Sequence, residues 1–309
     1  MNFKNLYERL FYQSLRIRMV EERIIKLYPS DKIQSPVHLS IGQEAVAVGA
    51  CESLTATDLV FGTYRSHAFY LAKGGDMPQM FAELFGKSTG CCGGKGGSMH
   101  LAAPEVGLMG ASAVVASTIP HAVGAALAAK RLGKPQVIVA VFGDGAMDEG
   151  VYHESLNFAA LHSVPVIFLV ENNSLAVHSH IESRHAFSTI PHAQVYGLRA
   201  RRIDEGYDFV RIAEEFSDIV AEVRKTWIPQ LVEIRTFRFK EHVGVGDDYD
   251  SGYRDRRELV EWQAHDPLSV DTELAKRYGH SIAQEIDEAV RFAEESTWPE
   301  KEALLRDVI

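Results

Sequence analysis

Two short polar motifs in this sequence could together bind a metal ion and a diphosphate. Gly143-Asp144-Gly145-Ala146 begins where the apolar run 137–142 ends, and Glu171-Asn172-Asn173 follows the apolar run 164–170. Residues 149–162 between the runs are typical of a helix, so the segment predicts a right-handed βαβ unit. Both strands of such a unit end at the same edge of a parallel sheet, and this would bring Asp144 and Asn173 face to face.

Carboxylate and amide oxygens are the ligands that a hard cation such as Mg²⁺ prefers, and phosphate oxygens and water complete its shell. The glycines would let a diphosphate approach the backbone, and a helix N-terminus behind them would favour an anion. Alone, an Asp-Gly pair after a strand is often a simple turn, and Asn172-Asn173 could also be one. Their occurrence at the ends of consecutive predicted strands favours a metal-diphosphate site.

Other residues could add phosphate binding and proton transfer. Tyr64 and Arg65 occur in the motif TYRSH (63–67), and a guanidinium is a good bidentate partner for phosphate, although a surface Arg and a core Tyr are the alternative. His38, His67 and His242 are candidates for acid-base chemistry near neutral pH. A structural role is commoner for any lone histidine, and we assign that role to His100.

Composition restricts the class of protein. The chain has 309 residues, a net charge of −10 and no block rich in Lys and Arg, which argues against nucleic acid or an anionic membrane as partner. No apolar run approaches the ~18 residues of a membrane span, and the N-terminus lacks the features of a signal peptide, so we expect a cytoplasmic protein. Three cysteines, Cys51, Cys91 and Cys92, make neither a disulfide framework nor the spacing of a zinc site.

The predicted elements alternate between strands and helices, which implies an α/β fold with a mostly parallel sheet flanked by helices on both faces. We expect one domain over 1–309, with an N-terminal helix (1–28) and a helical tail (268–309) as appendages. The tail should break at Gly279 and at Trp298-Pro299. The remaining predicted helices are 41–54, 120–132 and 149–162, and the strands are 59–61, 137–142, 164–170 and 229–235.

Local signals add detail at the ends of these elements. Ser40 is a candidate N-cap for the helix 41–54, and Gly133 is placed as the C-cap of the helix 120–132. The glycine-dense stretch 86–99 predicts an irregular, close-packed loop. Residues 243–256 predict a mobile loop, and its acidic run Asp247-Asp248-Tyr249-Asp250 is expected to be solvated, because it lacks the alternating ligand pattern of a calcium site.

The ordered series of motifs resembles the α subunit of thiamine diphosphate-dependent E1 components of 2-oxo acid dehydrogenases, the group that includes pyruvate, branched-chain and acetoin dehydrogenases. The resemblance covers almost the whole chain. Only the paired motifs around Asp144 and Asn173 are specific to thiamine diphosphate, but the series as a whole is specific to the α subunit. The segments that carry it are 38–49, 63–67, 86–100, 119–130, 143–150, 153–161, 166–173, 236–242 and 266–268.

The resemblance implies a role for each site residue. Asp144 and Asn173 would ligate Mg²⁺ through their side chains and Leu175 through its carbonyl. The diphosphate would be held by Tyr64 and Arg65 and by the backbone amides of Gly145 and Ala146. The stretch Ala113-Val114-Val115 would meet the aminopyrimidine, with Val115 as the apolar wedge. His242 would be the active-site histidine, and His38 and His67 would lie near the mouth of the site.

The resemblance also implies the reaction and the partners. The cofactor would decarboxylate a small-molecule 2-oxo acid and pass the acyl group to the lipoyl domain of an E2 component. A glutamate that activates the cofactor would come from an E1 β subunit, so the site would be complete only in an assembly of two α and two β subunits.

The sequence departs from the family pattern in several places. Leu175 is usually aromatic, Ala113 is usually Gly or Ser, and His178 and His180 stand where small residues or proline are commoner. Around His242 the family's Gly-His-Ser is Glu241-His242-Val243, and the loop after it is longer by about two residues. Two alternatives therefore stay open: an enzyme that transfers the acyl group to another acceptor, such as an aldehyde, without a lipoyl partner, and a non-catalytic scaffold.

Overall fold

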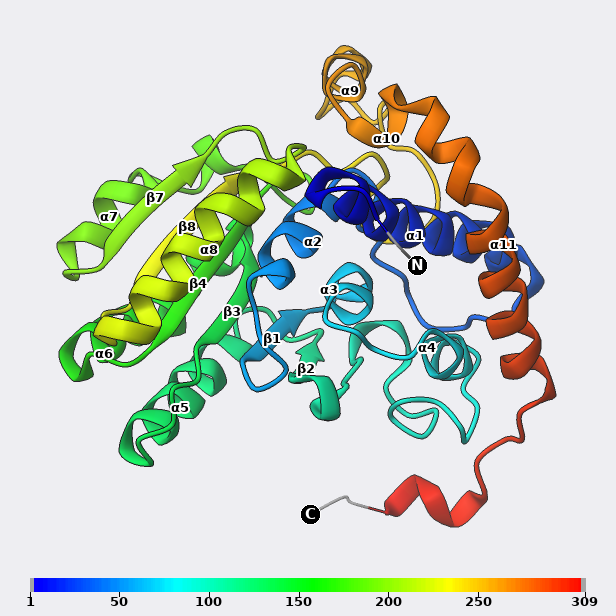
Figure 1. The fold of residues 1–309 in the computed structure, drawn as a ribbon, viewed down its shortest axis with the longest axis horizontal. Coiled ribbons are helices and arrows are strands. Elements are labelled where there is room, and N and C mark those ends of the chain that lie inside the picture. Colours follow the sequence, from blue (N-terminus) through cyan, green and yellow to red (C-terminus); the bar gives the residue numbers. More distant parts are fainter. Residues whose placement is uncertain (1–2, 307–309) are drawn as a thin grey trace.

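The computed structural model describes residues 3–306 and contains a six-stranded, fully parallel sheet (Figure 1). Its spatial order is β2-β1-β3-β4-β8-β7. The strands are β1 (Leu59–Thr63), β2 (Leu108–Ser112), β3 (Ile138–Gly143), β4 (Val166–Asn172), β7 (Arg199–Ile203) and β8 (Gln230–Arg235). A separate antiparallel pair, β5 (Leu175–Ala176) and β6 (Ser179–His180), follows β4 directly. The predicted α/β fold is therefore confirmed.

Helices cover both faces of the sheet (Figure 1). One face packs on α5 (Thr118–Arg131), α6 (Gly150–His162) and α7 (Thr189–Val195). The other face and the side of the molecule away from β7 are covered by helices that share one large core. These helices are α1 (Leu6–Leu27), α2 (Glu44–Glu52), α3 (His67–Ala72), α4 (Met77–Leu84), α8 (Phe209–Thr226) and α11 (Thr272–Glu295). Two short helices, α9 (Arg256–Gln263) and α10 (Pro267–Val270), precede α11.

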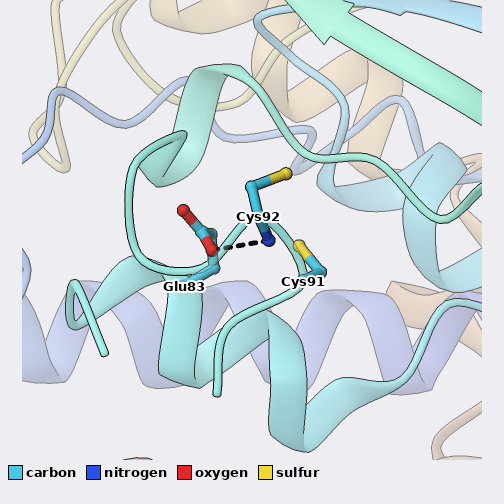
Figure 2. A group of neighbouring side chains, drawn as sticks. All are labelled: Glu83, Cys91 and Cys92. Atoms are coloured by element: carbon cyan, nitrogen blue, oxygen red, sulfur yellow. Dashed lines mark hydrogen bonds between the residues drawn. The ribbon is translucent and has the colours of Figure 1, made fainter. Parts of the chain in front are cut away.

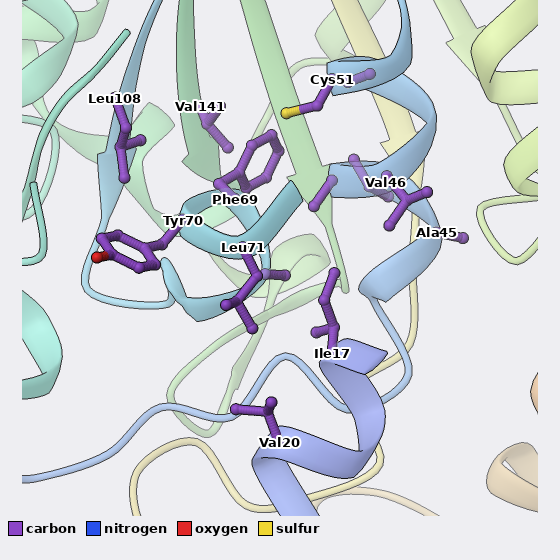
Figure 3. Packing of buried hydrophobic residues seen from close by; sticks show 14 of the residues in the cluster. Ile17, Val20, Ala45, Val46, Cys51, Phe69, Tyr70, Leu71, Leu108 and Val141 are labelled. Atoms are coloured by element: carbon purple, nitrogen blue, oxygen red, sulfur yellow. The ribbon is translucent and has the colours of Figure 1, made fainter. Parts of the chain in front are cut away.

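The central strands are apolar on both sides because each side faces a helical layer. In β3, Val139 and Val141 face the core with α1, α2 and α8, whereas Ile138, Ala140 and Phe142 face the core with α5, α6 and α7. Figure 3 shows Val141 near Phe69 of α3, in one cluster with Ile17 of α1 and Val46 of α2. This double burial explains why the runs in β3 and β4 are continuous rather than alternating.

The expected elements did not include β5 and β6, nor two strands of the six-stranded sheet, and these two lie at its edges. β7 carries Arg199, Arg201 and Arg202, and it pairs with one neighbour, β8. β2 contains Gly110 and likewise pairs only with β1. Edge strands tolerate charged residues and glycine because one flank faces away from the sheet, so the apolar signal that identifies a buried strand is weak there.

Three details of the helices differ from expectation. Ser40 does not cap a helix: α2 begins at Glu44, and the Ser40 hydroxyl is buried without a hydrogen-bond partner. The capping-box partner of Ser40 would be Gln43, three residues later, but the Gln43 side chain accepts a hydrogen bond from Asn173 instead. The tail does not break at Gly279, which lies inside α11; its break before Trp298-Pro299 is confirmed. Gly133 adopts the predicted left-handed conformation, one residue beyond the cap of α5.

Candidate active site

A pocket of about 210 Å³ lies at the carboxyl ends of β1, β3 and β4. After β1 the chain adds β2 on one side of that strand, and it then adds β3, β4 and β8 on the other side. The strand order therefore reverses between β1 and β3. Open α/β sheets bind ligands at such a topological switch point, and the pocket lies there. The predicted site residues that line it are Tyr64, Arg65, Val115, Asp144, Gly145, Ala146, Asn173, Leu175 and His242.

Asp144 follows β3 directly and its side chain is 1% exposed. It begins a 3₁₀ turn (Asp144–Asp148), and α6 starts only at Gly150. This turn separates the glycine motif from the N-terminus of α6, which was expected to lie directly behind the motif. A diphosphate bound at the motif would therefore meet the backbone amides of the turn rather than those of the helix. Burial raises the pKa of Asp144, whereas the charge and hydrogen bond of Arg184 oppose that shift.

Asn173 follows β4, and two hydrogen bonds fix its amide. Its Nδ2 donates to Oε1 of Gln43 at 2.9 Å, and its Oδ1 accepts from the backbone N–H of Leu175 at 3.1 Å. The oxygen is therefore held on the side of β5, which also lines the pocket. Asp144, Asn173 and Leu175 thus offer a carboxylate, an amide oxygen and a backbone carbonyl around one cavity, a donor set that suits a hard divalent cation.

Gln43 and Glu171 are pocket residues to which the sequence analysis gave no role in the site. Gln43 is 1% exposed and orients the Asn173 amide. Burial raises the pKa of Glu171 to about 7, and the nearby Arg65 charge and a hydrogen bond with Gln43 oppose the shift. The sequence contained a signal for the role of Gln43. It is a polar residue in the mostly apolar stretch 41–51, and a side-chain amide that is buried there needs a hydrogen-bond partner.

Arg65 connects the TYRSH motif to two distant segments. Its Nη1 donates to the Leu39 carbonyl at 2.5 Å and its Nη2 donates to the His242 carbonyl at 3.1 Å. The side chain is buried but still lines the pocket. Arg65 therefore holds the segment that carries His242 against the carboxyl end of β1.

His38, Tyr64 and His242 form an aromatic cluster at the pocket. The ring centroid of His38 lies 4.4 Å from that of Tyr64 and 5.2 Å from that of His242. Burial, reinforced by the Arg65 charge, lowers the pKa of both histidines to about 3, so both rings are neutral at neutral pH. His242 lines the pocket, whereas His38 lies behind it with its Nδ1 buried and unpaired.

The other predicted residues lie farther from the cavity. His67 is fully buried, with Nε2 at 2.8 Å from Ser98 Oγ and Nδ1 at 3.2 Å from Glu21 Oε1, so it is not at the mouth of the pocket. His100 is exposed. Ala113 does not line the pocket, although the next residues, Val114 and Val115, do.

The rim of the pocket carries strained backbone. Ala116 and Val177 have φ values of 61° and 56°, in the left-handed region that is especially unfavourable for a β-branched residue such as Val177. A Cβ added at Gly145 would lie 2.9 Å from the Cβ of Ala176. This close approach of β5 explains the need for glycine at position 145.

Comparison with known proteins identifies the family of this chain. The model of the dehydrogenase E1 component family matches residues 12–302. The chain belongs to the dehydrogenase E1 component family. Membership identifies it as an α-type E1 chain, an oxidoreductase component of the 2-oxo acid dehydrogenase type with thiamine diphosphate as its cofactor.

The similar proteins are α subunits. Over 97% of its length this E1 chain is 34% identical to the α subunit of acetoin:2,6-dichlorophenolindophenol oxidoreductase from Bacillus subtilis (strain 168), covering 92% of that protein. It is 36% identical to chloroplastic pyruvate dehydrogenase E1 component subunit alpha-3 from Arabidopsis thaliana, with 94% of this chain and 71% of the relative covered. The pyruvate dehydrogenase E1 α subunit of Porphyra purpurea is 34% identical, with 96% and 91% covered.

One departure of this E1 chain from the family pattern has a structural explanation. Glu241 Oε1 accepts a hydrogen bond from the backbone N–H of Gly246 at 2.7 Å. A Cβ at Gly244, which has φ +114°, would come within 2.4 Å of the same oxygen. Glu241 therefore fastens the turn that follows His242.

The acidic run in the loop 243–256 is solvated only in part, at Asp247 and Asp250, which are exposed. Asp248 and Tyr249 are buried, and Asp248 lies between two buried arginines. Its Oδ2 is 2.8 Å from Arg238 Nη1 and its Oδ1 is 2.6 Å from Arg254 Nε. The Tyr249 hydroxyl donates to the Phe239 carbonyl at 3.0 Å. These contacts hold the centre of the loop against the protein, so the expectation of solvation is wrong at Asp248 and Tyr249, and the mobility of the loop stays a prediction.

The glycine-dense loop 86–99 is organised by Glu83 (Figure 2). This fully buried carboxylate accepts four backbone N–H bonds, from Cys92, Gly94, Gly96 and Gly97, at 2.6 to 3.0 Å. Ligand atoms of Glu83, Cys91 and Cys92 lie within 4.8 Å of one another. Since the four amides already satisfy the carboxylate, we interpret Glu83 as the anchor of the loop.

Proposed function

We propose that this chain is the cofactor-binding α subunit of a thiamine diphosphate- and Mg²⁺-dependent 2-oxo acid dehydrogenase E1 that passes an acyl group to a lipoyl domain. The observation that carries the proposal is the convergence on one cavity of Asp144 after β3, Asn173 after β4, and Tyr64 and Arg65 after β1. Family membership gives the cofactor, and the donor set supports Mg²⁺ as its counterion.

In this proposal the side chains of Asp144 and Asn173 and the carbonyl of Leu175 hold the metal. Tyr64 and Arg65 bind the diphosphate together with the amides of Gly145 and Ala146. When bound, thiamine diphosphate supplies the electron sink for decarboxylation of the 2-oxo acid. His242 enters this environment as a neutral imidazole that can donate or accept a proton at the mouth.

A partner chain would complete the site. The cavity of about 210 Å³ is smaller than the ~300–1,000 Å³ typical of pockets for drug-sized ligands. Apolar side chains are exposed at its rim, with Val114 at 67%, Val115 at 43% and Val177 at 44%. Both features support an E1 β subunit as the partner that covers this edge, in an assembly of two α and two β subunits.

The two alternatives lose support. Transfer to an aldehyde was suggested by the departures around His242, but Glu241 has a structural role, and the relatives are E1 α subunits. A non-catalytic scaffold would not be expected to keep Asp144, Asn173, Tyr64 and Arg65 around one cavity.

The proposal is tested by calorimetric titration of thiamine diphosphate and Mg²⁺ into this chain together with its β subunit. We expect saturable, Mg²⁺-dependent binding, and Asp144→Ala should abolish it while the circular dichroism spectrum stays that of the wild type. Binding by Asp144→Ala with unchanged affinity would refute the metal assignment. A folded wild-type complex that binds no cofactor would refute the proposal itself. With binding established, a panel of 2-oxo acids with and without lipoyl domain tests the reaction.

A further inference from the structure

Arg184 contacts the predicted metal ligand although no sequence motif pointed to it. Its Nη2 donates to Asp144 Oδ2, and its Nη1 lies 2.5 Å from Asp148 Oδ2. The two carboxylates stand at either end of the 3₁₀ turn that follows β3, so one guanidinium spans the whole turn. The Arg184 side chain is only 13% exposed. A bridge of this kind uses the planar fork of arginine, which a lysine cannot reproduce.

The guanidinium reaches Asp144 from outside the pocket. Asp144 and Asp148 both line the cavity, whereas Arg184 does not. Its Nε lies 3.3 Å from the Ser179 carbonyl, on β6, which also stays outside the cavity. Arg184 therefore hydrogen-bonds one oxygen of Asp144, Oδ2, from outside the cavity, and the other oxygen, Oδ1, would be the one offered to a cation there.

The segment that carries Arg184 is itself held in place. The next residue, His185, pairs through Nε2 with Asp148 Oδ1 at 2.7 Å. Its ring stacks on Phe187 at 4.6 Å, and Phe187 stacks on His192 of α7 at 4.2 Å. This stack fixes the direction from which the Arg184 guanidinium approaches Asp144. A fixed direction is needed if the guanidinium is to orient the Asp144 carboxylate and not only neutralise its charge.

We propose that Arg184 is a positioning residue for the metal, which sets the orientation of the Asp144 carboxylate and holds the turn Asp144–Asp148 in its ligand-ready shape. The inference rests on the proposed Mg²⁺-diphosphate site. The opposite possibility is that Arg184 competes with the metal for Asp144. The two roles give opposite changes in Mg²⁺ affinity when the guanidinium is removed.

The test uses the complex with its β subunit and compares Arg184→Gln and Arg184→Lys with the wild type. Mg²⁺ is titrated at a fixed, saturating concentration of thiamine diphosphate, and binding is followed by calorimetry. We expect Arg184→Gln to weaken Mg²⁺ binding by roughly 10- to 100-fold, the usual cost of losing a group that orients a metal ligand. Arg184→Lys should restore only part of the affinity, because an ammonium cannot bridge both carboxylates. At saturating Mg²⁺ the turnover number of the glutamine variant should approach that of the wild type.

Arg202→Gln is the matched control, because Arg202 is an exposed arginine that pairs with Asp204 away from the pocket. It should leave Mg²⁺ affinity unchanged. Unchanged or tighter Mg²⁺ binding by Arg184→Gln would overturn the inference, and tighter binding would establish competition. If the glutamine variant does not fold, the Mg²⁺ affinity of Arg184→Lys decides the question. A folded lysine variant with wild-type Mg²⁺ affinity would also overturn the inference. Absence of metal-dependent binding in the wild type would instead count against the proposed function.

Discussion

At the scale of single residues, the candidate site depends on burial more than on residue type. Asp144 and Asn173 are ordinary polar residues that gain their chemistry from their place at one cavity and from partners that hold each side chain in one orientation. His242 differs from exposed histidines for the same reason. Burial and the Arg65 charge lower its pKa to about 3, so it is a neutral imidazole at neutral pH.

His242→Ala should separate binding from turnover. His242 lines the mouth of the pocket and contributes no oxygen ligand, so cofactor affinity should stay near that of the wild type. Turnover should fall by roughly 100-fold or more, the usual contribution of a positioned acid-base group. Steady-state kinetics and calorimetry of the assembled enzyme measure both quantities. His100→Ala, at an exposed position, is the control. Lost affinity with normal turnover at saturation would contradict this role.

At the scale of elements, the loop 243–256 shows how a polar segment becomes ordered. Asp248 and Arg254 of the loop form a buried charged triad with Arg238, whose Nη2 also donates to the Val177 carbonyl at 3.1 Å. That bond reaches the strained residue at the pocket rim. The triad therefore couples the loop to the turn after β5. The loop begins directly after His242, and both His242 and Val177 line the pocket.

Asp248→Asn should release this loop. It leaves two buried arginines without their carboxylate, and removal of one partner from a buried ion pair typically costs about 3–5 kcal/mol. We expect a lower unfolding midpoint and faster tryptic cleavage between Lys240 and Arg256. Asp250→Asn, at an exposed position of the same loop, is the control and should change neither quantity. Wild-type cleavage rates for Asp248→Asn would show that the triad does not anchor the loop.

At the scale of the whole molecule, the histidine cluster is buried by segments far apart in the sequence. His38 precedes α2, Tyr64 follows β1, and Gly244 donates its backbone N–H to the Val37 carbonyl at 2.8 Å. The terminal helices are integrated in the same way, because α1 and α11 share the large core and lie side by side (Figure 1). No helix within residues 3–306 has the length and apolarity needed to cross a membrane.

Stability should therefore fall in acid. Unfolded histidine has a pKa near 6.5, whereas burial lowers the pKa of His38 and His242 to about 3 in the folded protein. Between these values the unfolded chain binds protons that the folded chain does not, so stability decreases as the pH falls from about 6.5 toward 3. Thermal unfolding across this range should show a smaller dependence for His38→Gln. His280→Gln, at an exposed position of α11, should retain the full dependence.

The sequence by itself determined the α/β class, the central strands and the two motifs that carry the predicted metal ligands. These properties are local, because a doubly buried strand needs a continuous apolar run and a strand end needs glycine and polar residues. Only the tertiary structure decided that Gln43 orients Asn173, that Arg184 bridges Asp144 and Asp148, and that Asp248 is buried between two arginines. The contacts of Gln43 and Arg184 join segments distant in sequence, and those of Asp248 depend on how its loop folds back on itself. Periodicity and turn signals contain no information about such partners.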